Sequence, residues 1–200
     1  MADRKKENAV VISQEMLADG IFSMWLRTEA AKTAVPGQFI SMYTNDGTKL
    51  LPRPISICEI NKEESALRVV YRVTGENTGT KQFSEAKAGD VIPVIGPLGN
   101  GFPLEKCEGK KAFLMGGGIG VPPILELAKQ LKNCEKQIVM GYRDANTFLK
   151  EQFEENGTVY VSTEDGSVGT KGNVMDAIRE NGLTADIIYA CGPTPMLRAI

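Results

Sequence analysis

The sequence predicts an antiparallel β-barrel followed by an α/β domain built on a parallel sheet. The first hundred residues hold short β-branched or alternating segments separated by turn residues, a spacing that favours a small barrel. After about residue 105, apolar strands alternate with amphipathic helices, which is typical of parallel strands joined by helical crossovers. We therefore expect a barrel domain over residues 1–105 and an α/β domain over residues 106–200.

Six segments of the first half have the length and the β-branched composition of strands. They are residues 9–12, 21–26, 38–43, 55–58, 67–73 and 91–95. Glycine, proline and asparagine lie between them at the positions where hairpin turns are expected. One short helix, over residues 80–86, interrupts the series.

In the second half, strands and helices alternate regularly. Strands are expected at 112–115, 137–142, 158–162 and 186–189, and helices at 122–131, 147–155, 173–180 and 193–200. Because parallel strands end at the same edge of a sheet, residues that follow these strands are candidates for one ligand site.

Composition excludes several functional classes. The chain has 200 residues, 42% of them hydrophobic and 24% charged, as in an ordinary water-soluble protein. A net charge of −2 gives no electrostatic reason to expect a nucleic-acid partner. No apolar run is long enough for a membrane span, and the charged N-terminus lacks the apolar core of a secretory signal. We therefore expect a cytoplasmic protein without a membrane or nucleic-acid partner.

The cysteines and the absence of histidine restrict the possible chemistry. The four cysteines, Cys58, Cys107, Cys134 and Cys191, form no CxxC pair, so a metal site built from this chain alone is not expected. Without histidine, imidazole can neither bind a metal nor transfer a proton. Any redox reaction must therefore depend on a bound cofactor.

A glycine-rich loop joins an expected strand to an expected helix and contains Gly116, Gly117, Gly118 and Gly120. Glycine lets the backbone approach a phosphate closely, and the following helix offers free N–H groups. Val121 occupies the place of the third glycine of G-x-G-x-x-G, and no Lys-Ser/Thr pair follows, so neither standard phosphate motif is complete. The alternative is a plain turn between strand and helix.

Three segments of the first half are candidates for a flavin site. Arg53 begins a strand and can pair with a pyrophosphate, while Pro54 fixes the chain direction, Ile55 continues the strand and Ser56 can bond a flavin edge. The other candidates are Gly79-Thr80, where a loop enters a helix, and Tyr71-Arg72, which could pack on the ring and pair with its phosphate. The alternatives are a basic strand end, a helix capped by Thr80 and an ordinary barrel wall.

Two segments of the second half follow parallel strands. Cys191, with Gly192 and Pro193, ends the last expected strand, where Cys191 would point toward a nicotinamide. Glu164, with help from Asp165, could bind a ribose diol and repel a 2′-phosphate, which favours NAD(H) over NADP(H). The alternatives are a small buried cysteine and a solvated acidic loop.

Together these residues resemble the ferredoxin–NADP reductase-like flavoproteins over nearly the whole chain. Within that family the chain is similar to the electron-transfer subunits of NAD-dependent, class B dihydroorotate dehydrogenases. The segments that carry the resemblance are 51–57, 70–72, 79–80, 96–102, 116–123 and 191–196. The most specific of these is Gly96-Pro97-Leu98-Gly99-Asn100-Gly101-Phe102.

The resemblance implies a ferredoxin reductase-like fold that binds FAD between its domains. The FAD contacts would fall on residues 53–56, on Val70, Tyr71 and Arg72, and on Gly79 and Thr80. NAD(H) would bind the α/β domain at the glycine-rich loop, Glu164, Gly192 and Pro193, with Cys191 as the catalytic position. The implied partner is an FMN-containing catalytic subunit that oxidises dihydroorotate in pyrimidine biosynthesis, in a heterotetramer.

The family also implies a [2Fe-2S] cluster that relays electrons between the two flavins. Its cysteine ligands lie C-terminal to the Cys-Gly-Pro motif, beyond Ile200, and none of the four cysteines here matches them. We expect a C-terminally truncated fragment, with a cluster-free member as the alternative.

Two other functions remain open from the sequence. One is a stand-alone NAD(P)H:flavin or ferredoxin oxidoreductase, and the other is a non-catalytic flavin-binding module. The intact motifs at both expected nucleotide sites argue against the module. The tetrapeptide at residues 53–56 argues against the stand-alone reductase, because the resemblance implies a different tetrapeptide at this place in that group.

Overall fold

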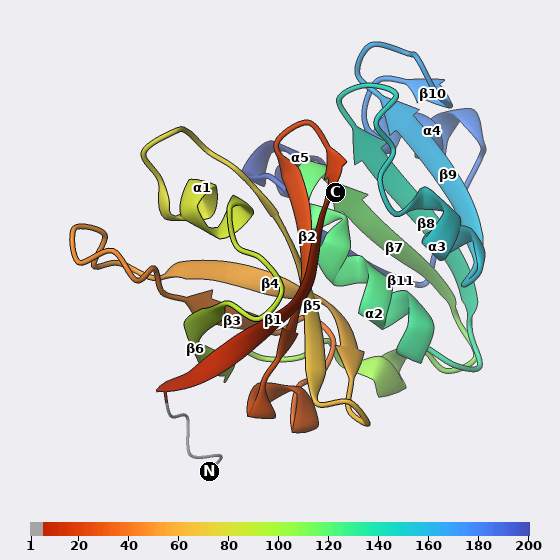
Figure 1. Cartoon of the computed structure of the whole chain (residues 1–200). Coiled ribbons are helices and arrows are strands. Elements are labelled where there is room, and N and C mark those ends of the chain that lie inside the picture. The colour runs from red at the N-terminus through yellow and green to blue at the C-terminus, as the bar shows by residue number, and fades with distance from the viewer. Residues whose placement is uncertain (1–5) are drawn as a thin grey trace. The chain divides into compact units, whose positions relative to one another are not determined.

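The computed structural model describes residues 6–200, which fall into two compact units (Figure 1). The first unit ends at Gly101 and the second begins at Phe102. The first is a closed antiparallel barrel and the second contains a five-stranded parallel sheet. The predicted fold class is therefore confirmed.

The barrel has six strands in the order β1-β2-β5-β4-β3-β6. Their bounds are β1 (Lys6–Ala18), β2 (Ile21–Arg27), β3 (Phe39–Met42), β4 (Arg53–Asn61), β5 (Ala66–Arg72) and β6 (Val91–Leu98). Every neighbouring pair is antiparallel, and β1 pairs with β6 to close the barrel.

Apolar side chains at every second position of the strands fill the interior of the barrel. Met24 and Leu26 of β2 and Leu67 and Val69 of β5 are fully buried in one apolar core. Successive side chains of a strand point to opposite faces, so these pairs lie two residues apart. Apolar burial of this kind is the main force that stabilises the barrel.

Short helices connect the strands of the barrel. They are η1 (Glu29–Lys32), a single 3-10 turn, and α1 (Gly79–Ser84), which lies between β5 and β6. Thr28 caps η1, because its side chain accepts a hydrogen bond from the Ala30 N–H. The helix α1 is the one predicted over residues 80–86.

The second unit has the strand order β10-β9-β8-β7-β11. The strands are β7 (Lys111–Gly117), β8 (Glu135–Tyr142), β9 (Thr158–Thr163), β10 (Thr170–Lys171) and β11 (Ile187–Cys191). The helices are η2 (Leu104–Cys107), η3 (Gly118–Gly120), α2 (Pro122–Gln130), α3 (Lys150–Glu154), α4 (Val174–Glu180) and α5 (Thr194–Ala199). All strand pairs are parallel.

The helix α4 packs on the sheet face that carries Phe113, Met115 and Val139. A capping box fixes its start: Asn173 accepts from the Met175 N–H at 2.8 Å, and Asp176 accepts from the Asn173 N–H at 2.9 Å. The carboxyl ends of β7, β8, β9 and β11 lie at one edge, with Cys191 in register with Gly116.

The strand β10 is the strand of the second unit that the sequence did not predict, and the short helices η2 and η3 were not predicted either. The strand β10 has two residues and pairs with Ser162 and Thr163 of β9, so no hydrophobic period marks it. The helix α3 is also shorter than the predicted 147–155 and begins after Leu149, which has a positive φ of 68°.

Candidate functional site

The first candidate site lies where the beginning of β4 meets α1. A Cβ built on Gly79 would lie 3.0 Å from Cγ2 of Thr44 and 3.3 Å from Nε of Arg53. The first turn of α1 is therefore in direct contact with the guanidinium. A larger residue at position 79 would fill the space beside Arg53, so the structure brings these two sequence-predicted residues together.

Arg53 is half-buried, and its Nη1 donates to the carbonyl of Leu51 at 2.5 Å. Among residues 6–200 no carboxylate pairs with it. A guanidinium has five N–H donors in a planar fork, so most of them remain free to bind an anion. This geometry fits one phosphate group of a nucleotide.

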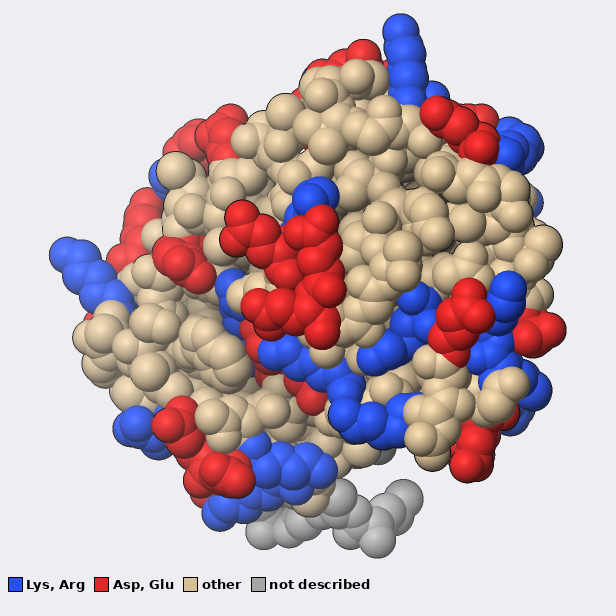
Figure 2. Space-filling model, turned by 90° about the vertical axis from the view of Figure 1, so that its right-hand side faces the viewer, with Lys and Arg blue, Asp and Glu red and all other residues tan. Residues whose placement is uncertain are grey.

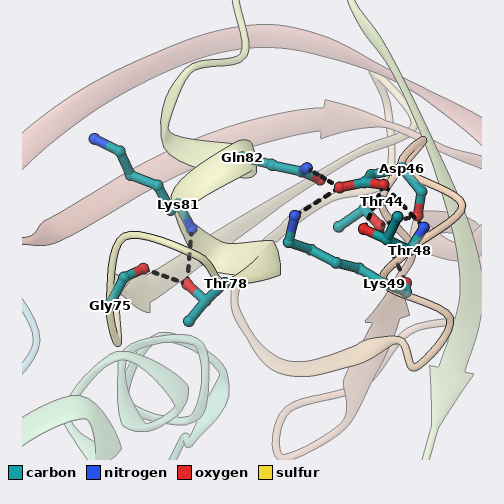
Figure 3. A network of polar contacts seen from close by, with 8 residues as sticks. All are labelled: Thr44, Asp46, Thr48, Lys49, Gly75, Thr78, Lys81 and Gln82. Atoms are coloured by element: carbon teal, nitrogen blue, oxygen red, sulfur yellow. Dashed lines mark hydrogen bonds and ion pairs between the residues drawn. The ribbon is translucent and has the colours of Figure 1, made fainter.

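A polar network fixes the β3–β4 loop against α1 (Figure 3). Oδ2 of Asp46 forms an ion pair with Nζ of Lys49 at 2.6 Å and accepts a hydrogen bond from Nε2 of Gln82 at 2.8 Å. The Lys49 ammonium is the main reason that the pKa of Asp46 lies well below its usual range, and hydrogen bonds from Thr48 and Gln82 add to the effect. Since Gln82 belongs to α1, this network holds the loop that leads to Arg53 in place.

Thr78, not Thr80, caps α1. Its hydroxyl accepts from the Lys81 N–H at 3.2 Å and donates to the carbonyl of Gly75 at 2.8 Å, as Figure 3 shows. Thr80 lies inside the helix and is 5% exposed, and its hydroxyl accepts from the Thr74 N–H at 3.3 Å. The capping role considered for Thr80 is therefore corrected, and its side chain supports the loop before the helix.

The β4 tetrapeptide presents two different faces. Ile55 packs against the barrel core, whereas Pro54 is exposed and Ser56 is half-buried on the opposite face. Pro54 and Ser56 therefore share one surface of the strand. A ligand on that surface can reach Ile55 through its backbone.

The prediction that the Tyr71 ring packs on a flavin is wrong. The ring is 1% exposed, stacks on Phe22 with centroids 6.0 Å apart, and meets Phe83 edge-on at 6.2 Å. Its hydroxyl donates to Oε1 of Gln14 at 2.6 Å, and burial raises its pKa. Val70 is also buried, while Arg72 is exposed at the end of β5. The backbone of residues 70–72 and the Arg72 side chain remain the candidates here.

The second candidate site lies at the carboxyl edge of the parallel sheet. A Cβ on Gly120 would lie 2.3 Å from the carbonyl oxygen of Cys191, and one on Gly117 would lie 2.6 Å from Sδ of Met196. The glycine-rich loop and the Cys191–Pro193 segment thus pack backbone to backbone. Gly118 has a φ of +53°, which favours glycine. The structure brings together the two motifs that the sequence assigned to a nucleotide.

Cys191 ends β11 beside Gly116 and is partly buried. Burial raises the pKa of its thiol, so the group stays neutral at physiological pH. A neutral thiol is small and polarizable and can lie against an uncharged ring without adding a charge.

Glu164 and Asp165 directly follow β9 at the same edge of the sheet. Oδ1 of Asp165 accepts from the Ser167 hydroxyl at 2.7 Å and from its N–H at 2.9 Å, and these bonds lower the pKa of Asp165. Asp165 therefore shapes its own turn, and its predicted help to Glu164 stays a prediction. Glu164 is exposed, and the described chain offers its carboxylate no partner, so it is free to accept from a diol.

Ser162 is a residue to which the sequence assigned no role. Its hydroxyl is completely buried at the end of β9 and has no hydrogen-bond partner among the described residues. A Cβ on Gly141 would lie 3.5 Å from this oxygen and 3.8 Å from the carbonyl of Gly116. A buried hydroxyl without a partner costs stability, so its place beside the glycine-rich loop marks a polar position that a ligand can satisfy.

Within residues 6–200, no three His, Cys, Asp or Glu side chains are placed to hold a metal ion. The described cysteines therefore do not fit a [2Fe-2S] cluster, which requires four ligands. No helix in this part of the chain has the length and apolar character needed to cross a bilayer. On the face drawn in Figure 2, acidic and basic side chains are interspersed among uncharged ones.

Solved structures match this chain along the length of both units. The structure of an NADH-dependent reduced ferredoxin-NADP oxidoreductase superimposes with a TM-score of 0.85 at 30% identity, covering 100% of this chain and 72% of that one. A ferredoxin NADP+ reductase from Neisseria gonorrhoeae with bound FAD and NADP gives a TM-score of 0.77, covering 98% and 89% of the two chains. That pair is 14% identical, so it shows the fold alone.

Relatives with known names agree with this chain in sequence along nearly its whole length. The electron transfer subunit of dihydroorotate dehydrogenase B (NAD(+)) from Streptococcus mutans is 44% identical over 199 residues, which are 98% of this chain and 76% of the relative. The subunit of the same name from Bacillus cereus is 42% identical over 202 residues, with coverages of 98% and 77%. No family model matches the chain. Because the identity extends over both units, the chain belongs to the family of electron transfer subunits of dihydroorotate dehydrogenase B (NAD(+)).

Proposed function

We propose that this chain binds FAD and NAD(H) and passes electrons to NAD+ from a partner subunit that oxidises dihydroorotate. The observation that carries the proposal is the 44% identity to an electron transfer subunit along 98% of the chain. The aligned length includes both candidate sites, so the relationship covers the proposed FAD site and the proposed NAD(H) site.

The proposed FAD site uses Arg53 and the first turn of α1 for the phosphates. The free N–H groups of Arg53 support this assignment, because an anion there meets a guanidinium that no described carboxylate pairs with. Gly79 supports it as well, because without a side chain the first turn of α1 lies directly beside Arg53. Pro54, the Ile55 backbone and Ser56 offer the adjoining surface. The Val70–Arg72 backbone and the Arg72 side chain complete the proposed contacts.

The proposed NAD(H) site uses the carboxyl edge of the parallel sheet. The glycines of the loop, Gly116, Gly117, Gly118 and Gly120, let its backbone pack closely against the Cys191–Pro193 segment, so that Gly192 and Pro193 continue the same surface. A pyrophosphate would bind the backbone N–H groups of this surface. Glu164 accepts from a ribose diol and repels a 2′-phosphate. The unpartnered Ser162 hydroxyl supports a polar ligand at this edge.

A bound FAD would supply the conversion between single electrons and the hydride that NAD+ takes. In this chain, Arg53 neutralises phosphate charge and Glu164 selects the nucleotide. The neutral Cys191 thiol borders the nicotinamide position without adding charge. The described residues hold no cluster site, so no step of this account passes through one.

The proposed partner is an FMN-containing subunit, with the two kinds of chain forming a heterotetramer. The relatives carry the words electron transfer subunit in their names, which supports a second chain. The proposed location is the cytoplasm, where thiols stay reduced, and the four described cysteines are all free.

A second candidate is a reductase that acts without the dihydroorotate partner. The 30% identity and TM-score of 0.85 to the NADH-dependent reduced ferredoxin-NADP oxidoreductase favour it. That comparison has lower identity than the relatives above, so the subunit remains the first proposal.

The test uses the purified, FAD-loaded chain and the dihydroorotate-oxidising subunit of a relative. We expect the two chains to co-elute in size-exclusion chromatography, with a mass that measures the stoichiometry. Separate elution at micromolar concentration, together with fast reduction of ferredoxin by NADH, would support the second candidate instead. A chain that retains no FAD would contradict both.

A further inference from the structure

Two cysteines far apart in the sequence lie together at the amino-terminal edge of the parallel sheet. Cys107 ends η2 and Cys134 immediately precedes β8, and backbone hydrogen bonds join the two segments that carry them. Both thiols are free. The nucleotide motifs lie at the carboxyl edge of the same sheet, so this pair belongs to neither candidate site.

Backbone hydrogen bonds hold the two segments side by side. The Gly109 N–H donates to the carbonyl of Asn133 at 2.8 Å, and the Glu135 N–H donates to the carbonyl of Lys110 at 3.0 Å. These bonds involve residues just after Cys107 and on both sides of Cys134. The segments that carry the two cysteines are therefore held next to each other by the β7–β8 pairing, which begins at Lys111 and Glu135.

The two thiols differ in access. Cys107 is completely buried, whereas Cys134 is partly exposed. An incoming reagent therefore meets Cys134 first. A pair with one accessible and one buried thiol is the arrangement in which the first sulfur is modified and the second displaces the modifying group.

Positive charge surrounds the pair. The ammonium of Lys136 interacts with both sulfurs while donating to the carbonyl of Ala128 at 2.8 Å, and Lys110 interacts with Cys107. Burial raises the pKa of Cys107 to about 12, and its contact with Cys134 adds to the rise. Once Cys134 is part of a disulfide, it no longer raises the pKa of Cys107, while the two lysines still lower it.

We propose that Cys107 and Cys134 form a thiol–disulfide exchange site that takes low-molecular-weight disulfides of the glutathione class and closes into an internal disulfide. The Cys134 sulfur loses its proton and attacks one sulfur of the reagent, whose S–S bond breaks and releases one thiol. The Cys107 sulfur then loses its proton and attacks Cys134, releasing the second thiol. The protein dithiol gives up two electrons, and the reagent disulfide becomes two thiols.

The internal disulfide ties η2 to the beginning of β8. It closes a loop across β7 and α2, so it restricts the unfolded chain of the second unit. Because it lies at the edge opposite the nucleotide motifs, its expected effect is on stability. Oxidation then raises the thermal midpoint of the second unit by several degrees.

The test incubates the whole protein with oxidised glutathione and maps its disulfides by mass spectrometry without reduction. We expect a cross-linked peptide pair containing Cys107 and Cys134, a mass lower by two hydrogens, and a reversible rise in the thermal midpoint. C107S should instead keep one glutathionyl group on Cys134, and C134S should stay unmodified at Cys107. C58S is the matched control, because Cys58 lies in the barrel, and it should still form the cross-link.

Two results would overturn the proposal. One is a stable glutathionyl group on Cys134 in a wild-type protein that never forms the cross-link. The other is an unchanged thiol content under glutathione ratios at which a model dithiol is oxidised. Mapping and thiol counting need only folded protein, so these readouts do not depend on the proposed electron-transfer function.

Discussion

Replacing Arg53 with alanine tests the proposed FAD site at the charged contact beside α1. In the structure, Arg53 has a single protein acceptor, the Leu51 carbonyl, and no paired carboxylate within residues 6–200. Its charge is therefore available to an anion, and a charge-assisted hydrogen bond contributes about 1.5–3 kcal/mol. Loss of that contact should raise the dissociation constant of FAD about 10- to 150-fold.

The assay is FAD occupancy, read from the visible spectrum after gel filtration, followed by titration of the apoprotein with FAD. Arg27→Ala is the matched control, because Arg27 is an exposed arginine at the end of β2 in the same barrel. Arg53→Lys keeps the charge but loses the planar fork, so its affinity should lie between those of wild type and Arg53→Ala. If Arg53→Ala binds FAD as tightly as Arg27→Ala does, the assignment of the phosphate site is wrong.

Three further predictions concern the second unit. Glu164→Ala should lower the ratio of NADH to NADPH reduction rates, because the repelling carboxylate is gone, and an unchanged ratio would remove the selection argument. Gly120→Ala places a Cβ against the Cys191 carbonyl and should destabilise the unit by about 1–3 kcal/mol in urea unfolding, whereas Gly47→Ala, in open space, should not. Burial raises the pKa of Cys191, so its thiolate forms only at higher pH, and iodoacetamide should modify it more slowly at pH 8 than a free small thiol. Equal alkylation rates would contradict that raised pKa.

The barrel-plus-sheet architecture could be predicted because both patterns are local. The short alternating strands of the first half and the strand–helix alternation of the second each repeat several times, so boundary errors of a few residues did not change the fold. The two-residue β10 could not be found this way, because its pairing with β9 depends on tertiary contacts.

The candidate sites were predictable at the level of motifs, but the direction of side chains was less so. Leu67, Val69 and Tyr71 alternate with Arg68 and Arg72, a signal that Tyr71 shares the core face of its strand. The prediction that Tyr71 packs on a flavin followed the chemistry of its ring and not this alternation. The orphaned Ser162 hydroxyl carried no such signal, because its burial results from packing around Gly141.

If the proposed function is right, this chain accepts a hydride from NADH onto its own bound FAD. The direct measurement is an anaerobic titration of the FAD-loaded protein with NADH, followed in the visible absorption of the flavin. We expect about one equivalent of NADH to bleach the flavin and NADPH to do so far more slowly. A flavin that keeps its absorption in excess NADH would show that the chain does not carry out this transfer.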